Sequence, residues 1–86
     1  MMPMTADQIK RLIEDSISGC EAFVDGDGTH FQATVVSSAF NGLSPVKKHQ
    51  LVYQALGDRM QSEIHAISIQ TYTPEEWARS RKFRVL

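Results

Sequence analysis

Hydrophobic residues near the N-terminus recur every three or four positions, which is typical of an amphipathic helix. The apolar positions are Ile9, Leu12, Ile13, Ile17 and Cys20. Thr5 and Gln8 have the spacing of a capping box, in which each side chain satisfies a free backbone N–H of the other residue. The pattern predicts a first helix from about Ala6 to Ser18, ended by Gly19.

The pattern then changes to a two-residue alternation, which is typical of β-strands. Ala22 and Val24 indicate a short strand, and residues 25–28 (DGDG) form a turn because glycine accepts positive φ. A second strand is predicted from His30 to Ser37. Residues 38–43 form a connector in which Phe40 enters the core.

Two further helices start with a hydroxyl residue followed by proline, a favoured cap and first-turn pair. These pairs are Ser44-Pro45 and Thr73-Pro74, with a third strand from Ile64 to Thr71 between the two helices. The last helix is expected to carry Trp77 inward. The order αββαβα predicts a single two-layer α+β domain over residues 1–86, with a three-stranded mixed sheet and helices on one face.

Two histidines, His30 and His65, stand at the entrances of strands that are separated by one helical crossover. Such a connection gives parallel strands, which begin at the same edge of a sheet. Neutral imidazole is the commonest protein metal ligand, so the two rings indicate a partial metal site that needs further ligands. The alternative for His65 is a structural role in which its ring is hydrogen-bonded to a backbone carbonyl. The alternative for His30 is that it is an exposed loop residue without a ligand.

Composition limits the function classes. The chain has 86 residues and a net charge of −1, so no overall attraction to nucleic acid or anionic membrane is expected. Its single cysteine and the absence of an apolar run near the ~20 residues that span a bilayer indicate a cytoplasmic protein without a membrane partner. Basic residues gather only locally, as Lys47 and Lys48, and as Arg79 and Arg81. Such groups are usually solvated, and at most they form a weak patch for a partner or a phosphate.

The remaining candidates favour structural roles. Cys20 lacks a histidine nearby in the sequence and continues an apolar stripe, so we expect a packed thiol rather than a nucleophile. His49 is expected to be a solvated or partly packed helix residue. The DGDG segment lacks the further oxygen ligands and closing glutamate of a calcium loop. We therefore predict that the protein is not an enzyme.

Two separated motifs give the chain a specific resemblance. They comprise residues 40–44 (FNGLS) with 47–53 (KKHQLVY), and residues 64–69 (IHAISI) with 72–79 (YTPEEWAR). In these segments, and over nearly its whole length, the chain resembles the BolA family. Residues 25–31 (DGDGTHF) are similar to the loop of the subgroup that has histidine there, including short bacterial proteins linked to acid stress.

The resemblance implies a fold like class II KH domains and a non-enzymatic adaptor function. Such adaptors pair with a monothiol glutaredoxin as a heterodimer and share a [2Fe–2S] cluster with the partner's cysteine and glutathione, in cluster trafficking or iron and stress sensing. Position by position, His65 and His30 match the family's ligands. The alternative is a DNA-binding transcriptional regulator of stress or morphology genes, with Lys47, Lys48, Arg79 and Arg81 as contacts to a partner or nucleic acid. KH domains bind through a G-x-x-G loop, whereas residues 40–45 contain one glycine.

Overall fold

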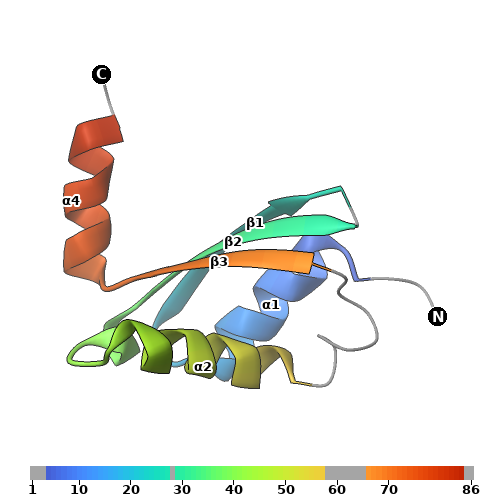
Figure 1. Ribbon diagram of the computed structural model, residues 1–86, viewed down its shortest axis with the longest axis horizontal. Coiled ribbons are helices and arrows are strands. Elements are labelled where there is room, and N and C mark those ends of the chain that lie inside the picture. Colours follow the sequence, from blue (N-terminus) through green and yellow to red (C-terminus); the bar gives the residue numbers. More distant parts are fainter. Residues whose placement is uncertain (1–3, 28, 58–65, 85–86) are drawn as a thin grey trace.

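The computed structural model describes residues 4–27, 29–57 and 66–84, with the side chains of residues 81–84 left out (Figure 1). Within these ranges, three helices and three strands follow one another in the predicted order. The elements are α1 (Ala6–Ser16), β1 (Cys20–Gly26), β2 (His30–Ser37), the 3₁₀ turn η1 (Ser38–Phe40), α2 (Pro45–Leu56), β3 (Ala66–Tyr72) and α4 (Pro74–Arg84). The predicted α+β fold is confirmed.

The predicted caps form as expected. The Thr5 hydroxyl accepts the Gln8 N–H at 3.2 Å, and the Gln8 side chain accepts the Thr5 N–H at 2.8 Å. The Ser44 hydroxyl accepts the N–H of Lys47 at the start of α2. Helix α1 ends at Ser16, two residues earlier than predicted, because Ile17 is extended (φ −115°, ψ 122°) while its N–H still bonds to the helix.

The three strands form one mixed sheet in the order β1-β2-β3. Strands β1 and β2 are antiparallel, whereas β2 and β3 are parallel with His30 opposite Ala66 and Val36 opposite Tyr72. Strand β1 is longer than the predicted segment, and β3 extends to Tyr72. The predicted start of the third strand at Ile64 lies outside the described residues.

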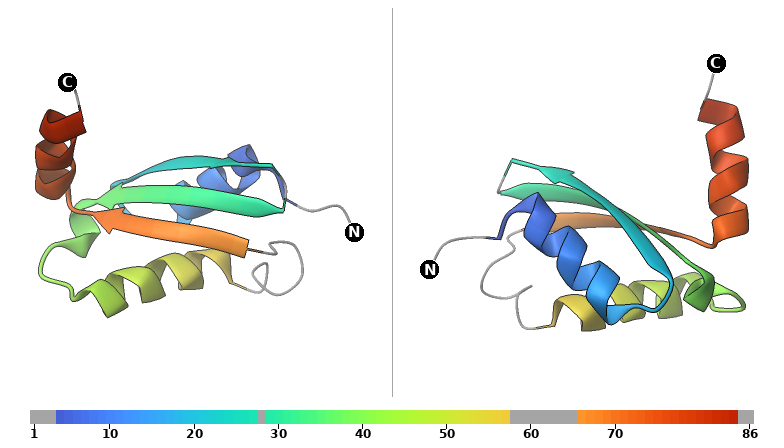
Figure 2. Two further views of the ribbon diagram at one scale, coloured as in Figure 1. Left: turned by 45° about the horizontal axis from the view of Figure 1, so that its top comes forward. Right: turned by 180° about the vertical axis from the view of Figure 1, so that it is seen from behind.

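Helices α1 and α2 cover the same face of the sheet, and the core lies between them and the strands (Figures 1 and 2). Apolar side chains from every layer are buried there: Ile9, Ile13, Ile17, Ala22, Phe31, Ala33, Val35, Phe40, Val52 and Leu56. Phe40 is fully buried, as predicted. No helix in the described ranges is long and apolar enough to cross a membrane.

Helix α4 departs from the predicted arrangement. It stands beyond the end of the sheet where β3 finishes, apart from the layer of α1 and α2 (Figure 2). Trp77 is half-buried and outside the core: its ring lies 5.5 Å from Phe23, stacked, and 5.3 Å from Tyr72. Because Phe23 alternates with the buried Ala22 in β1, it lies on the face of the sheet opposite α1 and α2. The prediction of an inward Trp77 is therefore wrong.

Candidate functional site

The candidate site lies where β2 and β3 begin, at one end of the sheet. Because the two strands are parallel, His30 lies directly opposite Ala66, at the roughly 5 Å spacing of paired strands. We call this end of the sheet, His30 with Ala66, the histidine edge. His65 immediately precedes Ala66 in the sequence and itself lies outside the described residues.

The hairpin between β1 and β2 fixes the backbone of His30 through Asp27. One oxygen of the Asp27 carboxylate accepts the N–H groups of Thr29 and His30, both at 2.9 Å. The Asp27 N–H in turn donates to the His30 carbonyl at 3.2 Å. The hydrogen bond from the His30 N–H, followed by that from Thr29, lowers the pKa of Asp27 below its usual value. The carboxylate is therefore ionised at neutral pH and closes the turn.

Gly26 allows the two strands to meet tightly beside His30. A Cβ at this position would lie 2.4 Å from the His30 carbonyl oxygen and 2.6 Å from Cδ1 of Phe31, at φ +158°. Any side chain here would displace backbone. The glycine and Asp27 thus set the position of His30 together.

The imidazole of His30 is available to a ligand. The residue is exposed, and its ring forms no hydrogen bond within the described part of the chain. A neutral imidazole with a free nitrogen suits a soft or borderline metal centre, so His30 fits one ligand position of an iron–sulfur cluster. Among the described residues, no group of three or more His, Cys, Asp or Glu side chains is arranged to hold a metal ion.

The basic residues gather at the other end of the sheet. Lys47 and Arg79 are exposed, whereas the Lys48 Nζ lies 3.3 Å from the Glu76 carboxylate with its side chain only 12% exposed. The side chain of Arg81 lies outside the described part of α4. We call Lys47, Lys48 and Arg79 the basic end. It is separated from the histidine edge by the length of β2, about 25 Å for a strand of eight residues.

Glu76 explains why Lys48 is held in place. Its carboxylate accepts the Thr73 N–H at 2.8 Å, and its own N–H donates to the Thr73 hydroxyl at 3.2 Å, which caps α4. The Thr73 N–H, followed by Lys48, lowers the pKa of Glu76. Lys48 therefore joins α2 to the start of α4, a contact between residues 28 positions apart that local sequence patterns do not reveal.

Cys20 does not form a reactive centre. Burial raises the pKa of its thiol to about 11, and the carboxylate of Glu14 adds to the increase. The thiolate is the nucleophile and the metal ligand, so a protonated, half-buried thiol suits packing.

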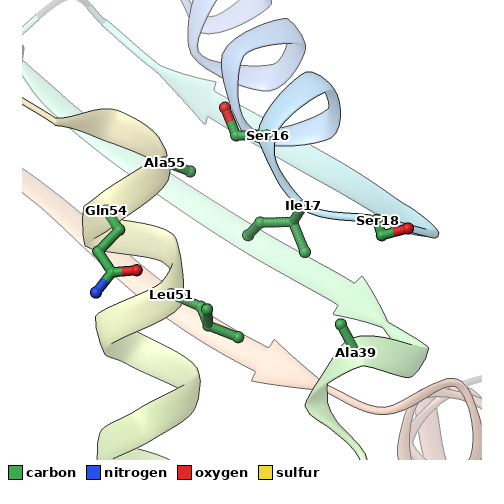
Figure 3. Close-up of a pocket in the computed structure, with 7 residues that line it drawn as sticks. All are labelled: Ser16, Ile17, Ser18, Ala39, Leu51, Gln54 and Ala55. Carbon is green, nitrogen blue, oxygen red and sulfur yellow. The ribbon is translucent and has the colours of Figure 1, made fainter.

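Two hollows were not predicted from the sequence. The first, about 240 Å³, lies between the end of α1 and α2 (Figure 3) and is lined by Ser16, Ile17, Ser18, Ala39, Leu51, Gln54 and Ala55. The second lies on the face of the sheet opposite α1 and α2 and is lined by Gln32, Ala33, Thr34, Ser68 and Gln70. Gln32 follows His30 on this face of β2, so the second hollow adjoins the histidine edge. The sequence did not predict this hollow, because a strand face exposed to water has alternating polar residues whether or not it forms a binding site.

The chain is similar to known proteins over most of its length. The family model described as BolA-like protein matches residues 8–76. The acid stress protein IbaG of Escherichia coli K12 is 45% identical over 80 residues, covering 92% of this chain and 95% of that protein. The DNA-binding transcriptional regulator BolA of Vibrio cholerae is 52% identical over 52 residues, which cover 60% of this chain and 49% of the regulator.

Solved structures share the fold. A BolA protein homologue from Coxiella burnetii superimposes with a TM-score of 0.80 at 45% identity, covering 87% of this chain and 97% of that chain. Yeast Fra2 superimposes with a TM-score of 0.73 at 32% identity, covering 99% and 96%.

Proposed function

Because the chain belongs to the BolA family, we propose that it is a non-enzymatic adaptor that pairs with a monothiol glutaredoxin and co-ligates a [2Fe–2S] cluster. His65 and His30 are the ligands from this chain. The partner supplies its cysteine and a glutathione thiol. A relative named as an acid stress protein supports a stress-related role.

The observation that carries this proposal is the geometry of the histidine edge. The start of β3, which directly follows His65 in the sequence, lies opposite His30 in the sheet. The His30 ring is exposed and unbonded within the described residues, while Asp27 fixes its backbone. An exposed ligand on a fixed backbone is suited to a centre that two proteins share, because each protein then contributes a preformed half.

The cluster is the cargo of this pair. An imidazole in place of a thiolate reduces the negative charge on the iron to which it binds and raises the reduction potential, as in Rieske centres. The ligating nitrogen must be unprotonated, so acid competes with the iron for the ring. A cluster held in this way is released or rearranged more readily in acid than one held by four thiolates.

The docking face for the glutaredoxin comprises the hairpin loop at Asp25–Thr29 and the adjoining strand ends. Exposed carboxylates of Asp25 and Asp27 flank His30 in this loop. Helix α4 lies at the opposite end of the sheet and is outside this face. Loss of the basic side chains of α4 therefore leaves the contact with the glutaredoxin intact.

The test is reconstitution of the protein with a monothiol glutaredoxin, glutathione, iron and sulfide. We expect a heterodimer with a visible circular dichroism spectrum different from that of the glutaredoxin homodimer. The His65→Ala and His30→Ala variants should each alter this spectrum or its stability, whereas His49→Ala, a control in α2, should not. A failure to associate, or an unchanged spectrum in both ligand variants, contradicts the proposal.

DNA binding is the second candidate function. It is favoured by the relative named as a DNA-binding regulator and by the exposed Lys47 and Arg79 at the basic end. The engagement of Lys48 by Glu76 and the net charge of −1 weigh against tight general binding.

The two functions use opposite ends of the sheet, so variants separate them. If the protein binds duplex DNA, Lys47→Ala and Arg79→Ala should each weaken binding. Each should also reduce the slope of the logarithm of the binding constant against the logarithm of the salt concentration by about one. Arg11→Ala, an exposed arginine of α1, serves as the control. Fluorescence anisotropy with a labelled duplex at low salt measures this, and an absence of binding there rules out general DNA binding.

A further inference from the structure

Strand β1 is an edge of the sheet, and its outer side is partly covered by two side chains of α1. The Ala22 N–H donates to the Glu14 carboxylate at 3.0 Å, and the Lys10 ammonium donates to the Ala22 carbonyl at 3.0 Å. Lys10 and Glu14 also pair with each other at 2.6 Å. We call these two side chains the Lys10–Glu14 clip. They satisfy the donor and the acceptor that a neighbouring strand would otherwise satisfy.

The clip covers only part of this edge. In an antiparallel ladder, alternate residues direct their backbone groups toward the partner strand and away from it. Because the groups of Ala22 point away from β2, those of Val24 do so as well. No hydrogen bond to the N–H or the carbonyl of Val24 on that side is formed within the described part of the chain. Releasing the clip would therefore leave two adjacent outward positions open for strand pairing.

A second copy of β1 matches these two positions. An antiparallel pair centred on Phe23 places Ala22 of each copy opposite Val24 of the other, which allows four backbone hydrogen bonds. The same register sets the Phe23 side chains directly opposite each other on the open face of the sheet. Phe23 is 44% exposed although it stacks on Trp77, so pairing would bury apolar surface that the monomer leaves in water.

We propose that the outer edge of β1 is a self-association surface and that the Lys10–Glu14 clip keeps it closed. With the clip in place, Ala22 has no free backbone group to offer and the ladder cannot extend past Val24. When the clip is removed, two copies join their sheets through β1. Edge strands are commonly protected against such pairing by charged side chains, and here the charges act by bonding the edge itself.

The register also contains an opposing element. Pairing centred on Phe23 sets Asp25 of one copy opposite Glu21 of the other, and like charges directly opposite each other are destabilising. Both residues are exposed and lie on the same face as Phe23. Neutralising Glu21 should therefore strengthen the pairing only if this register is the right one.

The test compares the wild type with the double variant Lys10→Ala/Glu14→Ala by analytical ultracentrifugation from micromolar to sub-millimolar concentration. We expect a predominantly monomeric wild type and a variant whose dimer dissociation constant is at least about tenfold lower. Adding Glu21→Gln should lower this constant further. The matched control is Arg11→Ala/Asp15→Ala, which removes one charge of each sign from exposed positions of α1 and should resemble the wild type.

A proline identifies the surface that is used. Val24→Pro removes the outward N–H, which an edge strand tolerates, and should return the double variant to a monomer. Where circular dichroism shows that the double variant is unfolded, the single variant Glu14→Ala replaces it and should raise association more than Asp15→Ala. A folded clip variant that remains monomeric, or a dimer that Val24→Pro leaves intact, overturns the proposal.

Discussion

The tight contact at Gly26 gives a prediction that joins the stability of the fold to the geometry of the site. In Gly26→Ala, the new Cβ would lie 2.4 Å from the His30 carbonyl oxygen, about 0.6 Å less than the 3.0 Å below which real Cβ contacts essentially do not occur. The neighbouring atoms include the Cα of Phe31 at 2.9 Å, so backbone rather than a flexible side-chain end has to move. His30 is displaced with it.

The magnitude follows from comparison with a glycine in open space. Gly42 has a positive φ of +78°, but its Cβ would meet no atom within 4 Å. Gly42→Ala therefore measures the conformational cost alone, about 1 kcal/mol. Gly26→Ala adds a clash in a packed hairpin, and we expect a total loss of about 2–3 kcal/mol. For a domain of this size, these losses correspond to a lower Tm by about 5 °C and about 10–20 °C.

The assay is urea unfolding followed by circular dichroism, with amide NMR spectra of both variants. The free energy of unfolding should fall more in Gly26→Ala, and the amide signals of Asp27 and His30 should shift only in that variant, because the bond from the Asp27 N–H to the His30 carbonyl is displaced. Equal losses of stability in the two variants, or unchanged hairpin signals in Gly26→Ala, would refute the reasoning.

Three further predictions follow from single residues. The pKa of Asp27 is lowered, so its hydrogen bonds to the hairpin are fully present above its ordinary pKa of 3.8 and are lost as the pH falls through the lower pKa of the folded state. In an NMR titration, the amide signals of Thr29 and His30 should therefore move together, with a midpoint below pH 3.8. A midpoint above pH 3.8 contradicts this account. The pKa of the Cys20 thiol is about 11, compared with 9.0 for an unperturbed thiol, so its reactive thiolate is scarcer and its alkylation should be about 100-fold slower. An alkylation rate equal to that of free cysteine would contradict this prediction. Phe40→Ala should cost about 3–5 kcal/mol in chemical unfolding because its ring is fully buried, and a loss below about 1 kcal/mol is incompatible with that burial.

The elements and the parallel pairing were predictable because they depend on local patterns. The capping box at Thr5, the Ser44-Pro45 helix start and the alternation along β2 each act within a few residues. The crossover between β2 and β3 then leaves one favoured arrangement, which predicts that His30 and the start of β3 lie side by side.

The contacts that were not predicted join residues that are distant in sequence. The residues around Trp77 in the sequence predict a helix, but they do not indicate whether its ring packs into the core or on the open face of the sheet. The stacking of Trp77 on Phe23 distinguishes these two positions. Lys48 resembles any solvated lysine until Glu76 is placed beside it. The role of Asp27 is different: the DGDG segment predicted the turn, but not which carboxylate would accept the His30 N–H.

The ligation of the cluster by histidine of this chain is the central claim, and it is measured most directly by electron paramagnetic resonance. The reduced cluster of the reconstituted heterodimer is examined by pulsed methods, with ¹⁵N-histidine introduced only into this chain. We predict a nitrogen hyperfine coupling that changes from the ¹⁴N to the ¹⁵N pattern on labelling and is lost or altered in His65→Ala. A cluster spectrum that shows no histidine coupling, or a coupling unaffected by labelling this chain, would contradict the account.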